Sequence, residues 1–397
     1  MSLAIALALG VWALTVAGVY GVAVVRAVWA GRRPVRSGSA LPPVLLVRPC
    51  AGTEPSLSRS LALSPDGLPP GSRVRFAVAR EDDPATPFCD RAAAELRAGG
   101  VDATRVVTAA AGPNQKASQL AAVLAREPDD LALVAVVDSD VDPASLVWSE
   151  LVGNWVDDPG VSAVWSPTVE SAGTTLGDRA SSALLGVTLH AFPLLAGLDP
   201  AGLVGKVMVV RRGELEAVGG FAALTGYLGE DMELSRRLRA RGGRVVATGA
   251  VARSLATGRS WEAAVGRYGR WLVVIRGQRP GLLASYPLLF FATPLVLAGA
   301  AGVCTWAGDA RARAVALGAA GVVLGARAAA ALAGRWRRGS GPWGAGLVVD
   351  AVLGDALLGR AFLRALGGRT VWWRGRALRV GTDGALTEGA GAEPDVR

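Results

Sequence analysis

Three long apolar stretches dominate the pattern of hydrophobic and polar positions. Residues 2–25 and 282–306 contain no charged side chain, and residues 314–334 contain only Arg327. About 20 apolar residues suffice for a helix that spans a bilayer. The first stretch lacks the basic start and short apolar run of a signal peptide, which favours a retained anchor. The pattern predicts a multi-pass membrane protein.

A fourth apolar stretch, residues 345–366, differs because it contains charged residues, namely Asp350, Asp355, Arg360 and Arg364. Charged side chains are costly in the hydrocarbon of a membrane. This stretch is therefore interpreted as an amphipathic interfacial or re-entrant helix.

Arginines flank the predicted spans on one side, and they include Arg26, Arg32, Arg33, Arg36, Arg335, Arg337 and Arg338. The positive-inside rule predicts that the N-terminus lies outside and that the central domain is cytoplasmic, at the cell membrane. The net charge is +9. No zinc-finger spacing, aromatic RNA-binding motif or periodic basic helix accompanies it, so nucleic acid is not an expected partner. Anionic lipid head groups explain the charge better.

The central region, residues 40–275, alternates short apolar runs with helical patterns. Helices are expected at 86–98 and 115–126, and strands at 44–47, 74–78 and 133–137. Such alternation predicts an α/β fold with a largely parallel sheet. Ligands in such sheets bind beyond the carboxyl ends of the strands. The sequence therefore predicts four regions: an anchor (1–30), this domain (40–275), a membrane region (282–367) and a tail that is first basic and then disordered (368–397).

Acidic residues follow two of the predicted strands. Asp138 and Asp140 come directly after the third, and residues two apart in an extended segment share a face. Their carboxylates suit Mg²⁺ or Mn²⁺ together with substrate phosphates. The alternative is a solvated acidic turn that opens a helix. Asp82 and Asp83 follow the second strand and either cap a helix or contact a nucleotide.

Two further sites precede or lie on predicted helices. Glu230 and Asp231 open a helix, where they either stabilise its N-terminus or supply a general base. Arg267 and Arg270 lie one turn apart, so they share a face that suits diphosphate oxygens, with Trp271 beside them. The alternative is a basic helix flanking the membrane. His190 is the single histidine, and a lone histidine is usually structural.

These motifs resemble family 2-type glycosyltransferases with a GT-A fold, and more closely the ceramide glucosyltransferase-like branch, family 21, and its bacterial relatives. The resemblance covers roughly residues 40–380. It rests on Asp82-Asp83-Pro84-Ala85, Asn114-Gln115-Lys116, Asp138-Ser139-Asp140, Gly205-Lys206-Val207-Met208, Tyr227 to Asp231 and Arg267-x-x-Arg270-Trp271. Ala79-Arg80 and Gln115 depart from the pattern of the relatives.

The resemblance implies an inverting transfer of a glucose-like sugar from a UDP-linked donor to a lipid hydroxyl. The acceptor is ceramide-like, with diacylglycerol and hopanoid-type lipids as alternatives. Asp138 and Asp140 would hold a divalent metal, Asp231 would be the base, and Arg267 and Arg270 would stabilise the diphosphate. Trp271 would shape the acceptor pocket. The substrate-contacting residues would be Asp82, Asp83, Lys116, His190 and Glu230.

Three other functions are compatible with parts of the pattern. Processive polysaccharide synthases share the Asp-x-Asp and x-x-Arg-Trp motifs, although three or four spans are few for a polymer channel. Glycosidases use paired carboxylates, but the arginine motif argues against them. A membrane-associated binding protein without activity is the third, and the intact set of acidic residues disfavours it.

Overall fold

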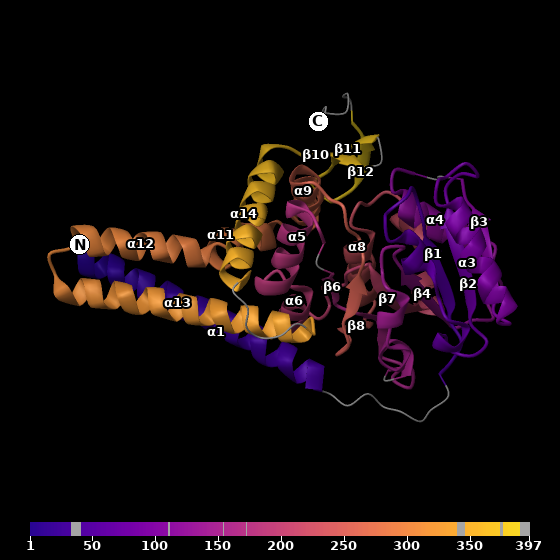
Figure 1. The fold of residues 1–397 in the computed structure, drawn as a ribbon, viewed down its shortest axis with the longest axis horizontal. Helices are drawn as coiled ribbons and strands as arrows, with labels where there is room; N and C mark the ends of the chain where they lie inside the picture. Colours follow the sequence, from indigo (N-terminus) through magenta and orange to yellow (C-terminus); the bar gives the residue numbers. More distant parts are fainter. Residues whose placement is uncertain are drawn as a thin grey trace.

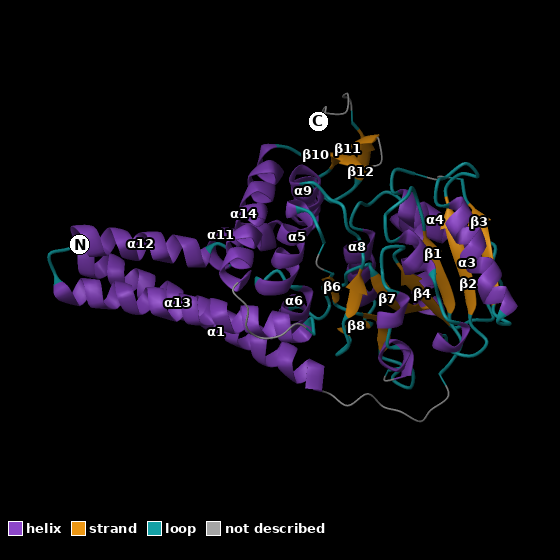
Figure 2. Ribbon diagram, in the orientation of Figure 1, coloured by secondary structure: helices purple, strands orange, loops and turns teal. Residues whose placement is uncertain are grey.

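A computed structural model describes the chain except for seven short gaps. Figures 1 and 2 show an α/β domain from which a bundle of long helices projects. The described residues are 1–32, 41–109, 112–153, 155–171, 173–339, 346–373 and 376–389. Arg33, Arg36 and residues 390–397 lie outside them. The mixed α/β domain with helices at both ends of the chain confirms the predicted fold class.

The core of the domain is a seven-stranded sheet with the order β3-β2-β1-β4-β7-β5-β8. All its neighbouring strands are parallel except β7, which is antiparallel to both β4 and β5. The strands predicted at 44–47, 74–78 and 133–137 are confirmed as β1, β2 and β4. The bounds are β1 Leu45–Pro49, β2 Arg73–Val78, β3 Asp102–Val107, β4 Leu133–Val137, β5 Val161–Trp165, β7 Val207–Arg211 and β8 Arg244–Ala247.

Strands β1 and β4 are buried along their whole length, as expected of strands covered on both faces. Helices α3 (Thr86–Ala98) and α4 (Gln115–Leu124) confirm the two predicted helices. Asn114 caps α4, because its side chain accepts a hydrogen bond from the Ala117 backbone N–H. Smaller elements complete the domain, namely α2 Leu57–Leu61, α7 Arg212–Ala217, α8 Glu230–Ala240 and the parallel pair β6 Thr168–Glu170 and β9 Ala252–Ser254.

Helices α1 (Ser2–Arg32), α12 (Ala292–Trp306) and α13 (Ala310–Arg337) form the projecting bundle (Figure 1). Only 17% of the apolar window of α1 and 33% of that of α13 are buried inside the protein, so most of their side chains face outward. Helix α12 follows α10 (Pro280–Ala284) and α11 (Tyr286–Leu289), with a 41° bend between. Helices α1 and α13 match two predicted spans in length and composition. The span predicted at 282–306 is instead divided among α10, α11 and α12, and it is long enough only if the bent pair is taken as one span.

One further segment among the described residues is long and apolar enough to cross a membrane but is covered by protein. It comprises α5 (Leu176–Val187) and α6 (Phe192–Leu198), and 83% of its apolar window is buried. Its hydrophobicity therefore serves the interior of the domain, between the bundle and the sheet (Figure 1).

Helix α14 (Gly346–Gly367) does not join the bundle. It crosses the bundle direction and packs on α5 and α9 (Trp261–Gln278) (Figure 1). Its carboxylates have protein partners, because Asp355 lies 2.7 Å from Arg327 of α13 and Asp350 lies 3.0 Å from Arg179 of α5. These ion pairs explain how the two carboxylates are accommodated in an otherwise apolar helix.

The C-terminal region differs from the prediction of a disordered tail. Strands β10 (Thr370–Trp373), β11 (Arg376–Val380) and β12 (Leu386–Glu388) form an antiparallel sheet that contacts α9. Leu378, Val380 and Leu386 are buried in it. The prediction was wrong for residues 382–389 because the Gly-, Ala- and Glu-rich composition conceals a short strand with the single buried side chain Leu386.

Candidate active site

Asp138 and Asp140 lie on a rigid loop at the carboxyl end of β4. Arg48 of β1 is fully buried, and its guanidinium donates hydrogen bonds to the backbone oxygens of Asp138, at 2.7 Å, and Val141, at 3.0 Å. The Asp138 N–H donates to the Lys206 carbonyl at 2.8 Å. The sequence pattern did not reveal this support, because Arg48 resembles an ordinary polar residue at a strand end.

Both lysines of the chain, among 42 basic residues, lie at this site. The Lys116 Nζ lies 2.7 Å from Asp138 Oδ1 and 3.3 Å from Glu230 Oε1. Lys206 pairs with the Asp140 carboxylate, which also accepts a hydrogen bond from Ser254 at 3.0 Å. Burial raises the pKa of Asp140, but Lys206 outweighs burial and holds that pKa well below its usual range. Lys206 and Ser254 were missed as site residues.

The carboxylates of Asp138 and Asp140 fit a divalent cation. Asp140 Oδ1 is buried and has no hydrogen-bond partner among the described residues, which leaves its lone pairs available to a cation. Oxygen-only ligands suit Mg²⁺ and Mn²⁺. The described ranges contain no group of three or more His, Cys, Asp or Glu residues arranged to hold a metal. The remaining ligands would therefore come from substrate phosphates and water, as is usual for Mg²⁺.

Asp231, in the first turn of α8, lies near this pair. Its Oδ2 accepts a hydrogen bond from the Gly205 N–H at 2.6 Å, and its Oδ1 accepts one from the Met232 N–H at 2.8 Å. Lys116 contacts the surroundings of both Asp138 and Asp231. Its Nζ pairs with Asp138 and also donates to the carbonyl of Gly205, at 2.8 Å. Burial and the neighbouring Glu230 raise the pKa of Asp231 to about 6. A carboxylate with this pKa is suited to accept a proton near neutral pH.

The loop before Asp231 is held from two sides. On one side, the Asn114 side chain donates to the Tyr227 carbonyl at 2.6 Å and to Glu230 at 3.0 Å. On the other, the C-terminal sheet contributes the Leu386 N–H, which donates to the Gly226 carbonyl at 2.7 Å. The loop thus depends on the region that had been predicted to be disordered.

Arg267, on α9, has a buried acidic partner that sequence reasoning missed. It forms an ion pair with Glu170 of β6, which is 3% exposed and lies 3.4 Å from Arg259. The Arg267 guanidinium also lies 4.9 Å from the centre of the Trp271 ring. No local signal identifies Glu170, because its partner is 97 residues away.

Arg270 differs from Arg267. The described part of the chain offers it no hydrogen bond or ion pair with an acidic residue. Burial, followed by the positive charges of Arg267 and Arg364, lowers the pKa of Arg270 to about 10. A largely buried guanidinium without a counterion is suited to bind an anion.

His190 lies among three aromatic rings, one of which, Tyr268, belongs to α9. The ring centroids of Tyr268, Tyr286 and Phe290 are 6.4, 6.1 and 5.7 Å from its own. Both ring nitrogens are buried without a hydrogen-bond partner. Burial lowers the pKa of His190 to about 4, so the ring is neutral. Tyr268 connects it to Trp271, whose ring lies 5.0 Å away.

The two aspartates after β2 have different surroundings. The Asp82 side chain is 78% exposed and pairs with Arg80. Asp83 is buried, and its Oδ1 accepts hydrogen bonds from the backbone N–H groups of Gly52, at 2.8 Å, and Ala85, at 2.9 Å. Asp83 therefore joins the loops after β1 and β2, whereas Asp82 points to solvent.

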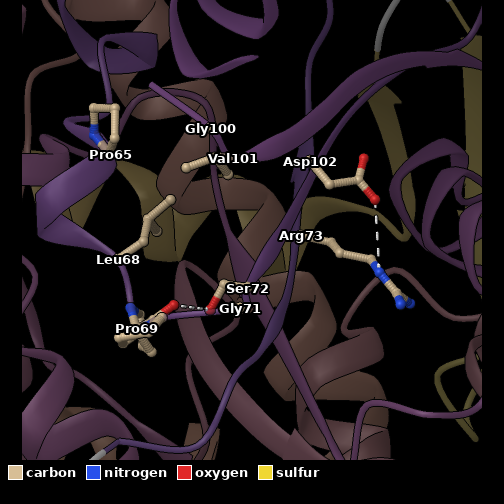
Figure 3. A pocket seen from close by; sticks show the side chains of 10 residues that line it. Pro65, Leu68, Pro69, Gly71, Ser72, Arg73, Gly100, Val101 and Asp102 are labelled. Atoms are coloured by element: carbon tan, nitrogen blue, oxygen red, sulfur yellow. Dashed lines mark hydrogen bonds and ion pairs between the residues drawn. The ribbon is translucent and has the colours of Figure 1, made fainter. Parts of the chain in front are cut away.

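A pocket of about 220 Å³ lies at the opposite edge of the sheet (Figure 3). It is lined by residues around the amino ends of β2 and β3, including Leu68, Arg73, Val101 and Asp102. Arg73 and Asp102 pair with each other at 3.6 Å. Asp138 and Asp140 lie at the carboxyl end of β4, so this pocket is separate from the candidate active site.

Two solved transferase structures are similar to this chain. A mannosyltransferase from Pyrobaculum calidifontis, PcManGT, solved with GDP-Man and Mn²⁺, is 19% identical and has a TM-score of 0.54, over 92% of this chain and 99% of its own. Glucosyl-3-phosphoglycerate synthase from Mycobacterium tuberculosis, solved with Mg²⁺ and UDP, is 18% identical over 59% of this chain and 78% of its own, with a TM-score of 0.35.

No curated protein matches the chain. The family model described as "Glycosyl transferase family 21" matches residues 9–386, which is nearly the whole chain. The protein therefore belongs to glycosyl transferase family 21 and is a glycosyltransferase with a GT-A-like domain.

Proposed function

We propose that this family 21 member is a membrane-bound inverting glycosyltransferase, which moves a glucose-like sugar from a UDP-sugar to the hydroxyl of a ceramide-like lipid. The observation that carries the proposal is Asp231. This carboxylate has a pKa of about 6 and shares the neighbour Lys116 with Asp138, in a domain joined to outward-facing apolar helices.

On the donor side, Asp83 and Lys116 contact the nucleotide sugar, while Asp138 and Asp140 hold Mg²⁺ or Mn²⁺. When bound there, the metal offsets the charge that develops on the departing diphosphate. The unpartnered Oδ1 of Asp140 supports this assignment. The presence of Mn²⁺ and GDP-Man in the similar mannosyltransferase supports it as well.

On the acceptor side, Asp231 accepts the proton of the lipid hydroxyl. The hydroxyl oxygen forms a bond to the anomeric carbon while the bond from that carbon to the diphosphate oxygen breaks, and its electron pair leaves with the nucleotide. Attack opposite the leaving group inverts the anomeric centre. Glu230 supports this step, because its charge helps to keep the pKa of Asp231 raised.

Arg270 stabilises the negative charge of the leaving diphosphate, because it is a cation without an acidic partner in the described part of the chain. Arg267, held by Glu170, contributes to the same positive field. Trp271 forms a wall of the acceptor pocket, and the neutral His190 lies behind it. Asp82 is the weakest member of the proposed site, because it is exposed.

The arrangement of the helices supports a cytoplasmic catalytic domain in the cell membrane. Figure 1 has the N-terminus and the turn between α12 and α13 at the far end of the bundle. Arg26, Arg32, Arg335 and Arg337 belong to the ends of α1 and α13 that are nearest to the domain. The positive-inside rule assigns that side to the cytoplasm.

Incubation of the purified protein with radiolabelled sugar nucleotides and extracted membrane lipids tests the proposal. The donors are UDP-glucose, UDP-galactose, UDP-N-acetylglucosamine and GDP-mannose. We expect one chloroform-soluble labelled product, formed from a UDP-sugar. A long water-soluble polymer would identify a polysaccharide synthase, and release of free sugar alone would identify a hydrolase.

Mild alkali then separates the acceptor classes. A glycosylated ceramide or hopanoid survives this treatment, because it has no ester, whereas a glycosylated diacylglycerol loses its acyl chains. Mass spectrometry of the surviving product distinguishes a ceramide from a hopanoid. Lipids from cells with and without the gene supply the matched comparison.

A further inference from the structure

A second cavity, of about 370 Å³, lies between α9 and α14, away from the carboxylate edge. Its lining is Glu262, Val265, Arg360, Leu363 and Arg364. The two helices approach closely beside it, because a Cβ placed on Gly269 would lie 3.4 Å from Cδ of Arg364. The glycine lets the arginine stem cross α9 and carry its guanidinium toward Arg270.

The positive charges around this cavity lack acidic partners among the described residues. Arg270, Arg360 and Arg364 make no ion pair there, and Glu262 at the rim makes none with them. Arg360 and Arg364 are four residues apart on one helix, where like charges repel. Arg364 also lowers the pKa of Arg270. A bound anion with several oxygens would relieve this repulsion and match the planar guanidinium groups.

The outer side of α14, next to the arginines, is apolar and exposed. The exposure of its large side chains lies between 47% and 73%, for Val348, Val349, Val352, Leu363 and Leu366. The helix crosses the direction of the bundle at its domain end (Figure 1). A helix with an apolar outer side and a basic flank, lying across the direction of the spans, is typical of the membrane interface.

We propose that the cavity between α9 and α14 binds the phosphate group of an anionic membrane lipid. Arg360 and Arg364 bind the phosphate oxygens, and the acyl chains lie along the exposed apolar side of α14. The lipid, rather than a free nucleotide, is the expected ligand because the same helix that supplies the arginines also supplies the apolar surface. The lipid charge would also offset the repulsion acting on Arg270, at the edge of the active site.

A thermal shift experiment tests this proposal without measuring sugar transfer, so its result is independent of the proposed function. The full-length protein in neutral detergent is titrated with phosphatidylglycerol, phosphatidylcholine or UDP, and its Tm is recorded. We expect phosphatidylglycerol to raise the Tm at lower concentrations than phosphatidylcholine. The Arg360→Gln/Arg364→Gln variant should need roughly 30-fold more phosphatidylglycerol, since each of the two basic residues near an anionic surface contributes about 1 kcal/mol.

The matched control is Arg311→Gln/Arg313→Gln, which removes the same charge at the far end of the bundle, where α13 begins. It should titrate like the unaltered protein. An equal loss in this control would mean general charge attraction and would overturn the proposal. Equal shifts with both lipids would do the same, as would a UDP shift that depends on Arg360 and Arg364. A variant that is unfolded before lipid addition is replaced by Arg360→Lys/Arg364→Lys, which keeps the charge and should retain most of the shift.

Discussion

The two sides of the candidate site have opposite charges, and the charged side chains on each side have different partners. On the carboxylate side, Asp138 pairs with Lys116 and Asp140 pairs with Lys206, at strand ends held by backbone hydrogen bonds. On the arginine side, both charges come from one helix, α9. Arg267 has the buried partner Glu170, whereas Arg270 has no acidic partner in the described ranges.

This difference separates charges that maintain the structure from charges that are available to a ligand. A buried charge with a partner is costly to remove, because the remaining partner is left unpaired. A charge without a partner raises the energy of the empty site and gains most when an anion binds. Asp231 lies between these cases, because its backbone hydrogen bonds lower its pKa while burial and Glu230 raise it.

The largest effect is expected on the carboxylate side, at Asp231. Asp231→Asn keeps the size of the side chain and removes its ability to accept a proton, so turnover should fall by about 10²–10⁴-fold. Binding of UDP, measured by calorimetry, should change little. Asp129→Asn, at an exposed aspartate before the amino end of β4, is the control and should keep most activity. Turnover near that of the unaltered protein in Asp231→Asn would refute the base assignment.

Metal removal tests the other carboxylates. Excess chelator should lower transfer by about 10²-fold, and Mn²⁺ or Mg²⁺ should restore it, because the metal supplies part of the charge stabilisation of the leaving group. The Asp140→Asn variant should not recover its transfer activity at the same metal concentration. Full activity in the chelator would instead indicate that Lys116 and Lys206 supply the positive charge without a metal.

The two arginines should respond differently to the same substitution. Arg270→Gln should lower turnover by about 10²-fold, since removing one charge-stabilising group typically costs 10²–10³, and should leave the Tm unchanged or slightly higher. Arg267→Gln should lower the Tm by roughly 5–10 °C, because Glu170 would lose its main partner. Adding Glu170→Gln to Arg267→Gln should recover part of that loss. Equal Tm changes for the two single variants would contradict the comparison.

The pH dependence of transfer reports the state of Asp231. A base must be deprotonated to act, and the raised pKa of about 6 places the midpoint of deprotonation there. The kcat/KM for the acceptor should therefore fall roughly tenfold per pH unit below pH 6 and be flat from about pH 7 to 8. Lys116 keeps its charge throughout, because its carboxylate neighbours outweigh burial and raise its pKa. A midpoint near pH 4 would mean that Asp231 is not the titrating base.

The positions of the acidic residues were easier to predict from the sequence than the surroundings of the arginines. Strand β4 is a run of apolar residues that Asp138 follows directly, so a local pattern locates both the strand and the acidic residues after it. Glu170 lies in a three-residue strand and acquires its role from a residue 97 positions away. The antiparallel insertion of β7 between β4 and β5 is also non-local. Patterns of local periodicity contain no information about such pairings.

The smallest effect is expected from the C-terminal sheet, which holds the loop before Asp231. Gly384 has a positive φ of 84°, and a Cβ placed on it would lie 2.4 Å from Cγ of Gln278, whose amide donates to the Gly229 carbonyl. Gly384→Ala should therefore displace the sheet from α9 and lower turnover by roughly 3- to 10-fold, since misplacement of a catalytic group by about 1 Å can cost as much as 10²-fold. Gly100→Ala is the matched control, because Gly100 has a similar φ of 81° and open space around it. Both variants carry the same backbone strain, so their difference in turnover at constant UDP affinity measures the contribution of the sheet to the position of Asp231. Equal turnover in the two would show that the loop is held by Asn114 alone.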